Sequence, residues 1–181
     1  MKWFRFALLV MASAVFGVGG GVSAQASSNT LQTFADGGAT VTIGTDGDSA
    51  TIVLTDGSQD GGVFLKSKSQ GGKLLNQVSF SFTSDGDVAG GAPRFSIPIN
   101  TSGTGSIDGY AFLDVLTCGY SSGPVNTGLA NCHVNFQGQD QGSWANFATA
   151  NPTYRTAPGA IPFIIADGTA GTYHVTSIVL R

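Results

Sequence analysis

Short apolar runs, several of them alternating with polar residues, recur along the chain between clusters of Gly, Asp and Ser. Two segments, 78–83 and 94–99, place an apolar side chain at every second position. Period-two alternation is typical of a strand with one buried face. On this pattern we predict strands at 40–43, 51–54, 63–66, 78–83, 94–99, 110–117, 132–136, 162–166 and 173–180.

The segments between these strands are rich in Asp-Gly pairs. All 11 acidic residues are Asp, and most of them precede Gly. Gly accepts a positive φ and Asp hydrogen-bonds to the turn backbone, so Asp-Gly favours tight hairpins. Glu, a strong helix former, is absent. The one helix that we expect is short, at 144–150, and is ended by Asn151 and Pro152.

Eight or nine short strands separated by turn signals are typical of two packed antiparallel sheets. We therefore predict an all-β, two-sheet antiparallel β-sandwich that is jelly-roll-like, with an immunoglobulin-like sandwich as the alternative. Because Pro98 cannot donate a ladder hydrogen bond, the strand at 94–99 is expected to be an edge strand or to carry a bulge.

The first 24 residues have the pattern of a secretory signal peptide, with Lys2 and Arg5, an apolar run at 6–18 and a small-x-small end at Ala24. The run is shorter than the ~20 residues of a comfortable membrane span, so we expect cleavage and no membrane insertion afterwards, with an uncleaved anchor as the alternative. We expect residues 25–38 to be a flexible N-terminal segment and residues 39–181 to be a single β-sandwich domain. The predicted location is secreted, in the extracellular space or at the cell surface, with the periplasm as an alternative.

The charge balance argues against nucleic acid as a partner. Charged residues make up 10% of the chain, and the formal net charge is −3 at pH 7. Phosphate binding requires clustered Lys and Arg. The cluster of Lys66, Lys68 and Lys73 is more typical of lysines that keep a strand edge soluble.

Two cysteines, Cys118 and Cys132, favour a disulfide in an exported chain. Closing a loop of this size is worth about 3 kcal/mol by chain-entropy arguments. The alternatives are a reactive thiol pair or a metal site, although neither CxxC spacing nor a set of further ligands is present.

The glycine-rich loop 100–108 has the spacing of an Asp-x-Asp-x-Asp-Gly calcium loop, and its oxygen-bearing residues would be Asn100, Ser102, Thr104 and Asp108. Calcium prefers six to eight oxygen ligands, several of them charged. Here Asp108 alone carries a charge. The loop thus predicts at most a weak calcium site, with an ordinary glycine-rich turn as the alternative, and no other cofactor is expected.

Asp114 lies inside an apolar strand, where alternation places it on the same face as Tyr110 and Phe112. A charge in that position must be paired or solvated. We consider a buried pair with Arg94 or Arg155, a carboxylate that contacts a ligand, and a simply exposed position.

Aromatic side chains provide surfaces on which sugars stack. Trp144, together with Tyr120, Phe147 and Tyr154, would make such a surface. The alternative is that Trp144 and Phe147, three residues apart, plug one end of the sandwich.

Three segments, 91–98, 161–168 and 171–175, resemble small secreted bacterial proteins of unknown function. The sequence at 173–180 is also similar to the last strand of jelly-roll modules of the carbohydrate-binding kind. The resemblance covers roughly residues 78–181. It implies a sandwich and an extracellular location, but no activity.

Together these features favour a non-catalytic binding module for an extracellular polysaccharide or a surface protein, with Trp144, Tyr154, Asp114 and Arg94 as ligand-binding residues. The alternative is a structural or matrix protein, favoured by the low charge and the 27 glycines. An enzyme is the least favoured class, because the Gly-x-Ser-x-Gly match at 119–123 lacks the helix that a nucleophile elbow requires.

Overall fold

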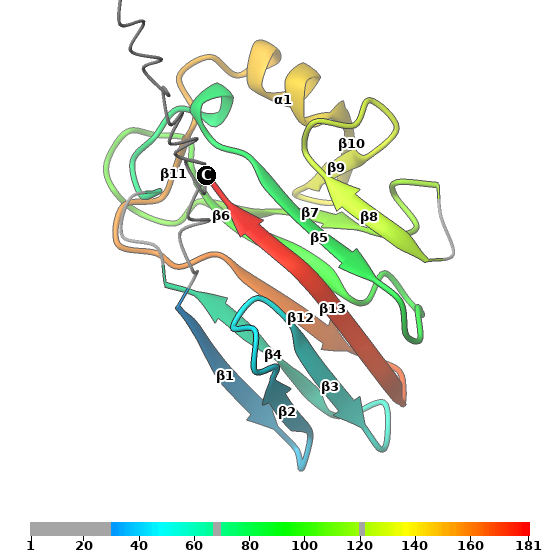
Figure 1. The fold of residues 1–181 in the computed structure, drawn as a ribbon. Coiled ribbons are helices and arrows are strands. Elements are labelled where there is room, and N and C mark those ends of the chain that lie inside the picture. The colour runs from blue at the N-terminus through cyan, green and yellow to red at the C-terminus, as the bar shows by residue number, and fades with distance from the viewer. Residues whose placement is uncertain (1–29, 67–69, 120–121) are drawn as a thin grey trace, which may run out of the picture.

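A computed structural model describes residues 30–66, 70–119 and 122–181, so the predicted signal peptide at 1–24 lies outside the described residues. In the described ranges the chain forms two antiparallel sheets packed face to face (Figure 1). The predicted all-β sandwich is confirmed, and the arrangement is consistent with a jelly-roll-like fold. No helix in these ranges is long and apolar enough to cross a membrane.

The larger sheet, here sheet A, has the strand order β1-β4-β12-β6-β7-β9-β10, and β11 also pairs with β6. Its strands are β1 (Leu31–Asp36), β4 (Asp60–Leu65), β12 (Phe163–Asp167), β6 (Arg94–Asn100), β7 (Gly109–Asp114), β9 (His133–Phe136), β10 (Gln139–Ser143) and β11 (Arg155–Thr156).

The smaller sheet, here sheet B, has the order β2-β3-β13-β5-β8. Its strands are β2 (Thr40–Ile43), β3 (Ala50–Leu54), β13 (Gly171–Leu180), β5 (Phe80–Ser84) and β8 (Gly123–Asn126). In Figure 1, β13 and β5 belong to one layer and β6, β7 and β12 to the other.

The core lies between the sheets and follows the predicted alternation. In β6, Phe95, Ile97 and Ile99 are at most 1% exposed. The Phe95 ring lies 5.2 Å from the ring of Phe80 and 5.7 Å from that of Phe82, both in β5, measured between centroids. Interlocked rings from the facing sheets therefore form the centre of the sandwich.

Some sequence-based expectations about the strands are corrected. Residues 31–36, expected to be flexible, form β1 and pair with β4 from Leu31 opposite Leu65 to Asp36 opposite Asp60. The sandwich therefore begins before residue 39. The strands β8, β10 and β11 were also not predicted.

Pro98 lies in a strand with neighbours on both sides, not in an edge strand. Its carbonyl accepts a hydrogen bond from the Ala157 N–H at 2.9 Å. Its ring nitrogen faces the same side as that carbonyl, away from β7. On this side β12 pairs with residues 94–96 and β11 with residues 99–100. Pro98 therefore lies between the segment of β6 that pairs with β12 and the segment that pairs with β11. Its missing N–H costs no hydrogen bond between strands.

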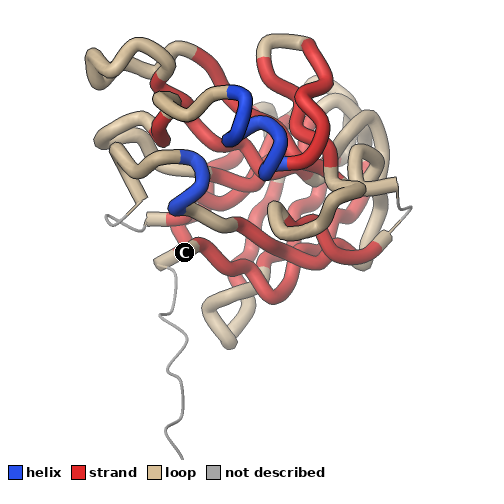
Figure 2. Tube along the Cα trace, turned by 90° about the horizontal axis from the view of Figure 1, so that it is seen from above, coloured by secondary structure: helices blue, strands red, loops and turns tan. Residues whose placement is uncertain are grey.

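A helical end plug closes one end of the sandwich. The helix α1 (Trp144–Ala150) matches the predicted bounds, and the Ser143 side chain caps it by accepting from the Asn146 N–H at 3.2 Å. Trp144 is 4% exposed, and its indole N–H donates to the Leu75 carbonyl at 2.9 Å in the short helix η1 (Leu75–Gln77). Figure 2, seen from above, shows both helical segments over this end of the strands.

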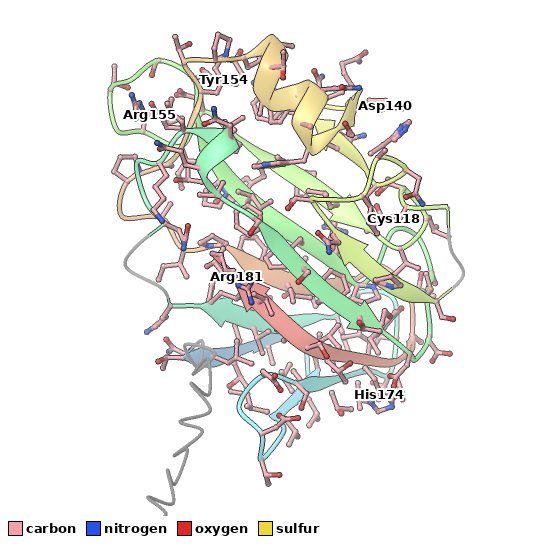
Figure 3. The ribbon with its side chains drawn as sticks, turned by 45° about the horizontal axis from the view of Figure 1, so that its top comes forward. Cys118, Asp140, Tyr154, Arg155, His174 and Arg181 are labelled. Atoms are coloured by element: carbon pink, nitrogen blue, oxygen red, sulfur yellow. A yellow bond between two sulfur atoms is a disulfide. The ribbon has the colours of Figure 1, made fainter. Side chains whose placement is uncertain are left out.

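The predicted disulfide between Cys118 and Cys132 is confirmed. Both residues are fully buried in the core. The Asn131 side-chain amide donates to the Cys118 carbonyl at 2.5 Å and braces the same connection. The bridge ties the turn after β7 to the start of β9, and Cys118 is labelled in Figure 3.

The outward face of sheet B is lined by hydroxyl groups. Because Ile52, Phe82 and Val175 point into the core, the residues between them point outward. We call this surface the hydroxyl face. Its hydroxyl-bearing members are Thr40, Thr42, Thr51, Ser81, Thr83, Thr172 and Thr176, and the register places Val53, His174, Val179 and Pro124 among them.

Replacing Trp144 tests the end plug. Trp144→Phe removes the indole donor and leaves the Leu75 carbonyl without it, so we expect the free energy of unfolding to fall by about 1–3 kcal/mol. Urea unfolding followed by circular dichroism measures the change without relying on tryptophan fluorescence. Thr149→Ala, at an exposed position of the same helix, serves as the control. Equal stability of Trp144→Phe and wild type would contradict the assigned role.

Candidate functional site

Five aromatic side chains project from the outward face of sheet A. In β7, Ala111 and Leu113 are buried in the core, so Tyr110 and Phe112 point outward. The same alternation holds in β1, β4 and β12, and all five outward rings are partly exposed. We call this set the aromatic face, and its members are Phe34, Phe64, Phe163, Tyr110 and Phe112.

The five rings form one continuous cluster. Phe34 lies 4.6 Å from Phe64 between ring centroids, and Phe163 lies 5.8 Å from both. Tyr110 meets Phe163 edge-on at 5.7 Å and stacks on Phe112 at 6.3 Å with 19° between the ring planes. These separations fall within the range of favourable aromatic pairs. Contacts between rings from four strands therefore hold the face together, and they bridge β6, which lies between β12 and β7.

A glycine makes room for the outermost ring. Gly62 in β4 is the register partner of Phe34 in β1. A Cβ at Gly62 would lie 2.6 Å from Cζ of Phe34 and even closer to the Ile164 carbonyl oxygen. Because Gly62 has no side chain, Phe34 folds over the strand and reaches Phe64 and Phe163.

An ion pair stands beside the rings. The Arg94 guanidinium donates to both carboxylate oxygens of Asp167, with Nη1–Oδ1 at 2.6 Å and Nη2–Oδ2 at 2.5 Å. The same guanidinium lies 5.2 Å from the centroid of the Phe112 ring, within range of a cation–π contact. A bidentate ion pair of this kind fixes the orientation of the guanidinium plane beside the aromatic face.

Asp114 lies opposite Arg94 in the β6–β7 register and is 8% exposed. Its Oδ1 accepts from the Thr117 N–H at 2.8 Å, and its own N–H donates to Thr117 Oγ1 at 3.1 Å. Burial raises the pKa of Asp114, against the lowering effect of the backbone N–H groups of Thr117 and Leu116 and of the Arg94 charge. Asp114 therefore closes the turn after β7, while Arg94 forms its ion pair with Asp167.

A groove adjoins the aromatic face where β7 meets β9 and β10. It has a volume of about 280 Å³ and is lined by Leu116, Thr117, His133, Val134, Asn135 and Asp140; we call it the polar groove. His133 Nδ1 lies 2.9 Å from Asp140 Oδ2, and this hydrogen bond lowers the pKa of Asp140. Asn135 is the register partner of Phe112, so the groove continues directly from the rings. Figure 3 shows Asp140 at this side of the molecule.

The loop 100–108 is closed by its own hydrogen bonds. Asp108 Oδ2 accepts four of them, from the N–H and the hydroxyl of both Thr101 and Ser102, at 2.8 to 3.1 Å. Ser102 and Thr104 join their hydroxyls at 2.7 Å. Asn100 is 2% exposed, and its amide binds the Gly103 N–H and the Ser106 carbonyl. Donors thus surround the one carboxylate, which does not fit the all-oxygen shell of calcium.

The four predicted ligand-binding residues are not brought together. Arg94 and Asp114 border the aromatic face, but Trp144 is buried in the end plug and leaves no ring face open to a sugar. Tyr154, labelled in Figure 3, lies at the helical end of the sandwich. Its ring lies 6.1 Å from the rings of Phe136 and Phe147, measured between centroids. Tyr120 lies outside the described residues.

Comparisons with protein-family models, with curated proteins and with solved structures find no match to this chain.

The raised pKa of Asp114 gives a pH-dependent prediction. In the range between the ordinary value of 3.8 and the raised value, the folded state binds more protons than the unfolded state, so stability falls as the pH rises through it. Asp114→Asn keeps an acceptor for Thr117 but carries no charge. We expect the variant to unfold at a higher temperature than wild type at neutral pH, with the difference vanishing below pH 3.8.

Thermal melts across this pH range provide the measurement for Asp114. Asp56→Asn is the matched control, because hydrogen bonds from Ser58 lower the pKa of Asp56 and its variant should lose stability at neutral pH. A variant at Asp114 that melts lower than wild type at neutral pH would refute the role of burial.

The closed loop predicts that calcium has no effect on stability. Because Asp108 Oδ2 already accepts four hydrogen bonds, we expect the melting temperature to be the same with calcium and with chelator. Differential scanning fluorimetry on wild type and Asp108→Asn measures this. A calcium-dependent rise in wild type that Asp108→Asn abolishes would instead establish a metal site.

Proposed function

We propose that this protein is a secreted, non-catalytic module that binds an extracellular polysaccharide through the aromatic face and the polar groove. The observation that carries the proposal is the continuous cluster of five partly exposed rings on the outward face of a sheet. Large contiguous apolar patches on a protein surface mark sites of interaction.

The chemistry of a sugar suits this surface. A pyranose ring carries C–H groups on its faces and hydroxyls around its rim. The C–H faces pack on aromatic rings, whose size and rigidity make the contact favourable at a low entropic cost. Neighbouring rings on adjacent strands offer consecutive stacking positions.

Polar groups beside the rings are suited to the hydroxyls. The polar groove presents His133, Asn135 and Asp140, and the pair of Arg94 and Asp167 borders Phe112. Ligand sites typically combine an apolar wall with a few placed polar side chains that set orientation. The aromatic face would provide the apolar wall of such a site, and the polar groove would provide the polar side chains.

Three further features support a place outside the cytoplasm. The first 24 residues have the pattern of a secretory signal. The disulfide is typical of oxidising compartments. The two-sheet antiparallel sandwich is consistent with the resemblance of the last strand to carbohydrate-binding modules.

Ring removal on matched surfaces tests the proposal. Phe112→Ala and Phe163→Ala each remove a stacking surface, so we expect retention of the protein on an insoluble polysaccharide to fall at least tenfold, or about 1.4 kcal/mol. The assay is a pull-down against a panel of plant, fungal and bacterial wall polysaccharides. Thr83→Ala and Thr176→Ala, on the hydroxyl face, are the controls, and circular dichroism verifies the fold of each variant.

Retention that is lost with the ring variants and kept with the threonine variants would establish the binding surface. Retention unaffected by either ring variant, or no retention of wild type on any polysaccharide of the panel, would refute the proposal and favour a structural or matrix role.

A further inference from the structure

One register row crosses sheet A from edge to edge on its outward face. Each member lies directly opposite the next one in the antiparallel ladder. From β1 to β10 the row consists of Gln32, Phe64, Phe163, Ser96, Phe112, Asn135 and Asp140. The row ends in polar side chains, Gln32 at one end and Asn135 and Asp140 at the other. Three rings of the aromatic face lie between these ends.

The length of this row is set by the strands. Seven strands leave six gaps of about 4.8 Å, so the row spans about 29 Å across the sheet. A single sugar would cover a small part of it. An elongated molecule lying across the strands would span the row and contact its members other than Ser96, which is fully buried.

The middle of the row contains a polar atom that has no partner. Ser96 is fully buried between Phe163 and Phe112, and its Oγ makes no hydrogen bond within the described part of the chain. A buried hydroxyl without a partner is costly. Because the neighbouring side chains cover this hydroxyl, a ligand on the outward face would contact the rings on either side of Ser96 and not Ser96 itself.

The charges along the row exclude an anionic ligand. The row contains no Lys or Arg, and its one charged member is Asp140. Arg94, two residues before Ser96 in β6, is held by both oxygens of Asp167. Recognition of carboxylate or sulfate groups relies on free cationic donors, which this row does not provide.

We infer that the ligand is an uncharged, extended, β-1,4-linked polysaccharide that lies across the strands along this row; the inference rests on the proposed function. Equatorial β-1,4 links give an extended ribbon with C–H groups on both faces, and such a ribbon can twist gradually along a row that crosses a twisted sheet. Chains with axial links coil and would leave the row after a few sugars.

A length series tests the inference. We expect cellohexaose to bind at least tenfold more tightly than cellobiose, with cellotetraose between them, when each is titrated by isothermal calorimetry. Gln32→Ala and Asp140→Ala should weaken binding of cellohexaose and leave binding of cellobiose unchanged, because these residues lie at the ends of the row. Thr83→Ala on the hydroxyl face is the control for both ligands.

A matched pair of polymers tests the charge argument. Affinity electrophoresis should show retardation of the protein in hydroxyethyl cellulose and weaker retardation in carboxymethyl cellulose, which has the same backbone with added carboxylates.

Each outcome separates the inference from the proposed function. Equal affinity for cellobiose and cellohexaose, or stronger retardation in carboxymethyl cellulose, would overturn the inference. Absence of binding to all these probes by a protein that is retained on another polysaccharide through Phe112 would also overturn it, while the proposed function stands. Retention that does not depend on Phe112 or Phe163 would refute both the inference about the ligand and the proposed function.

Discussion

The register of β6 against β12 and β7 is the constraint on which both sides of sheet A depend. Phe95, Ile97 and Ile99 enter the core, and Arg94 and Ser96 point outward. A slip of one residue would exchange the two sets. It would bury Arg94 in the core and break the alignment of Phe163 with Phe112 through Ser96. Packing of the core thus also holds the outward rings in line.

The sequence predicted the elements that are defined by burial. Alternation located the core of β6, and the helix bounds at 144–150 agree with α1. The strand Gln139–Ser143 was missed because it contains no apolar residue, and its pairing with β9 and its contacts with α1 hold it in place. The strand Leu31–Asp36 was missed for a similar reason, since four of its six side chains are exposed. Edge strands of this kind leave little hydrophobic signal.

The candidate site was harder to predict, for physical reasons. In Tyr110, Ala111, Phe112 and Leu113 both faces of the strand are apolar, so alternation identifies two sets without showing which one enters the core. Trp144 was predicted to bind a ligand because it is a large aromatic residue. Its burial and its hydrogen bond to the Leu75 carbonyl depend on tertiary packing, which the local sequence does not reveal. The partner of Arg94 is 73 residues away in the chain, a separation that local patterns do not reveal.

The hydroxyl face of sheet B has a consequence for how the molecule would sit on a solid support. Rings cluster on one outward surface of the sandwich, and the other surface carries mainly hydroxyls, with a few side chains such as Val53 and Val179 that are only partly exposed. Threonine and serine side chains bind water well and provide little area for adhesion. A molecule attached by its rings would therefore expose a hydrated surface to the solvent. This surface would offer a second molecule little apolar area to bind. Coverage would stop at a single layer of uniformly oriented molecules.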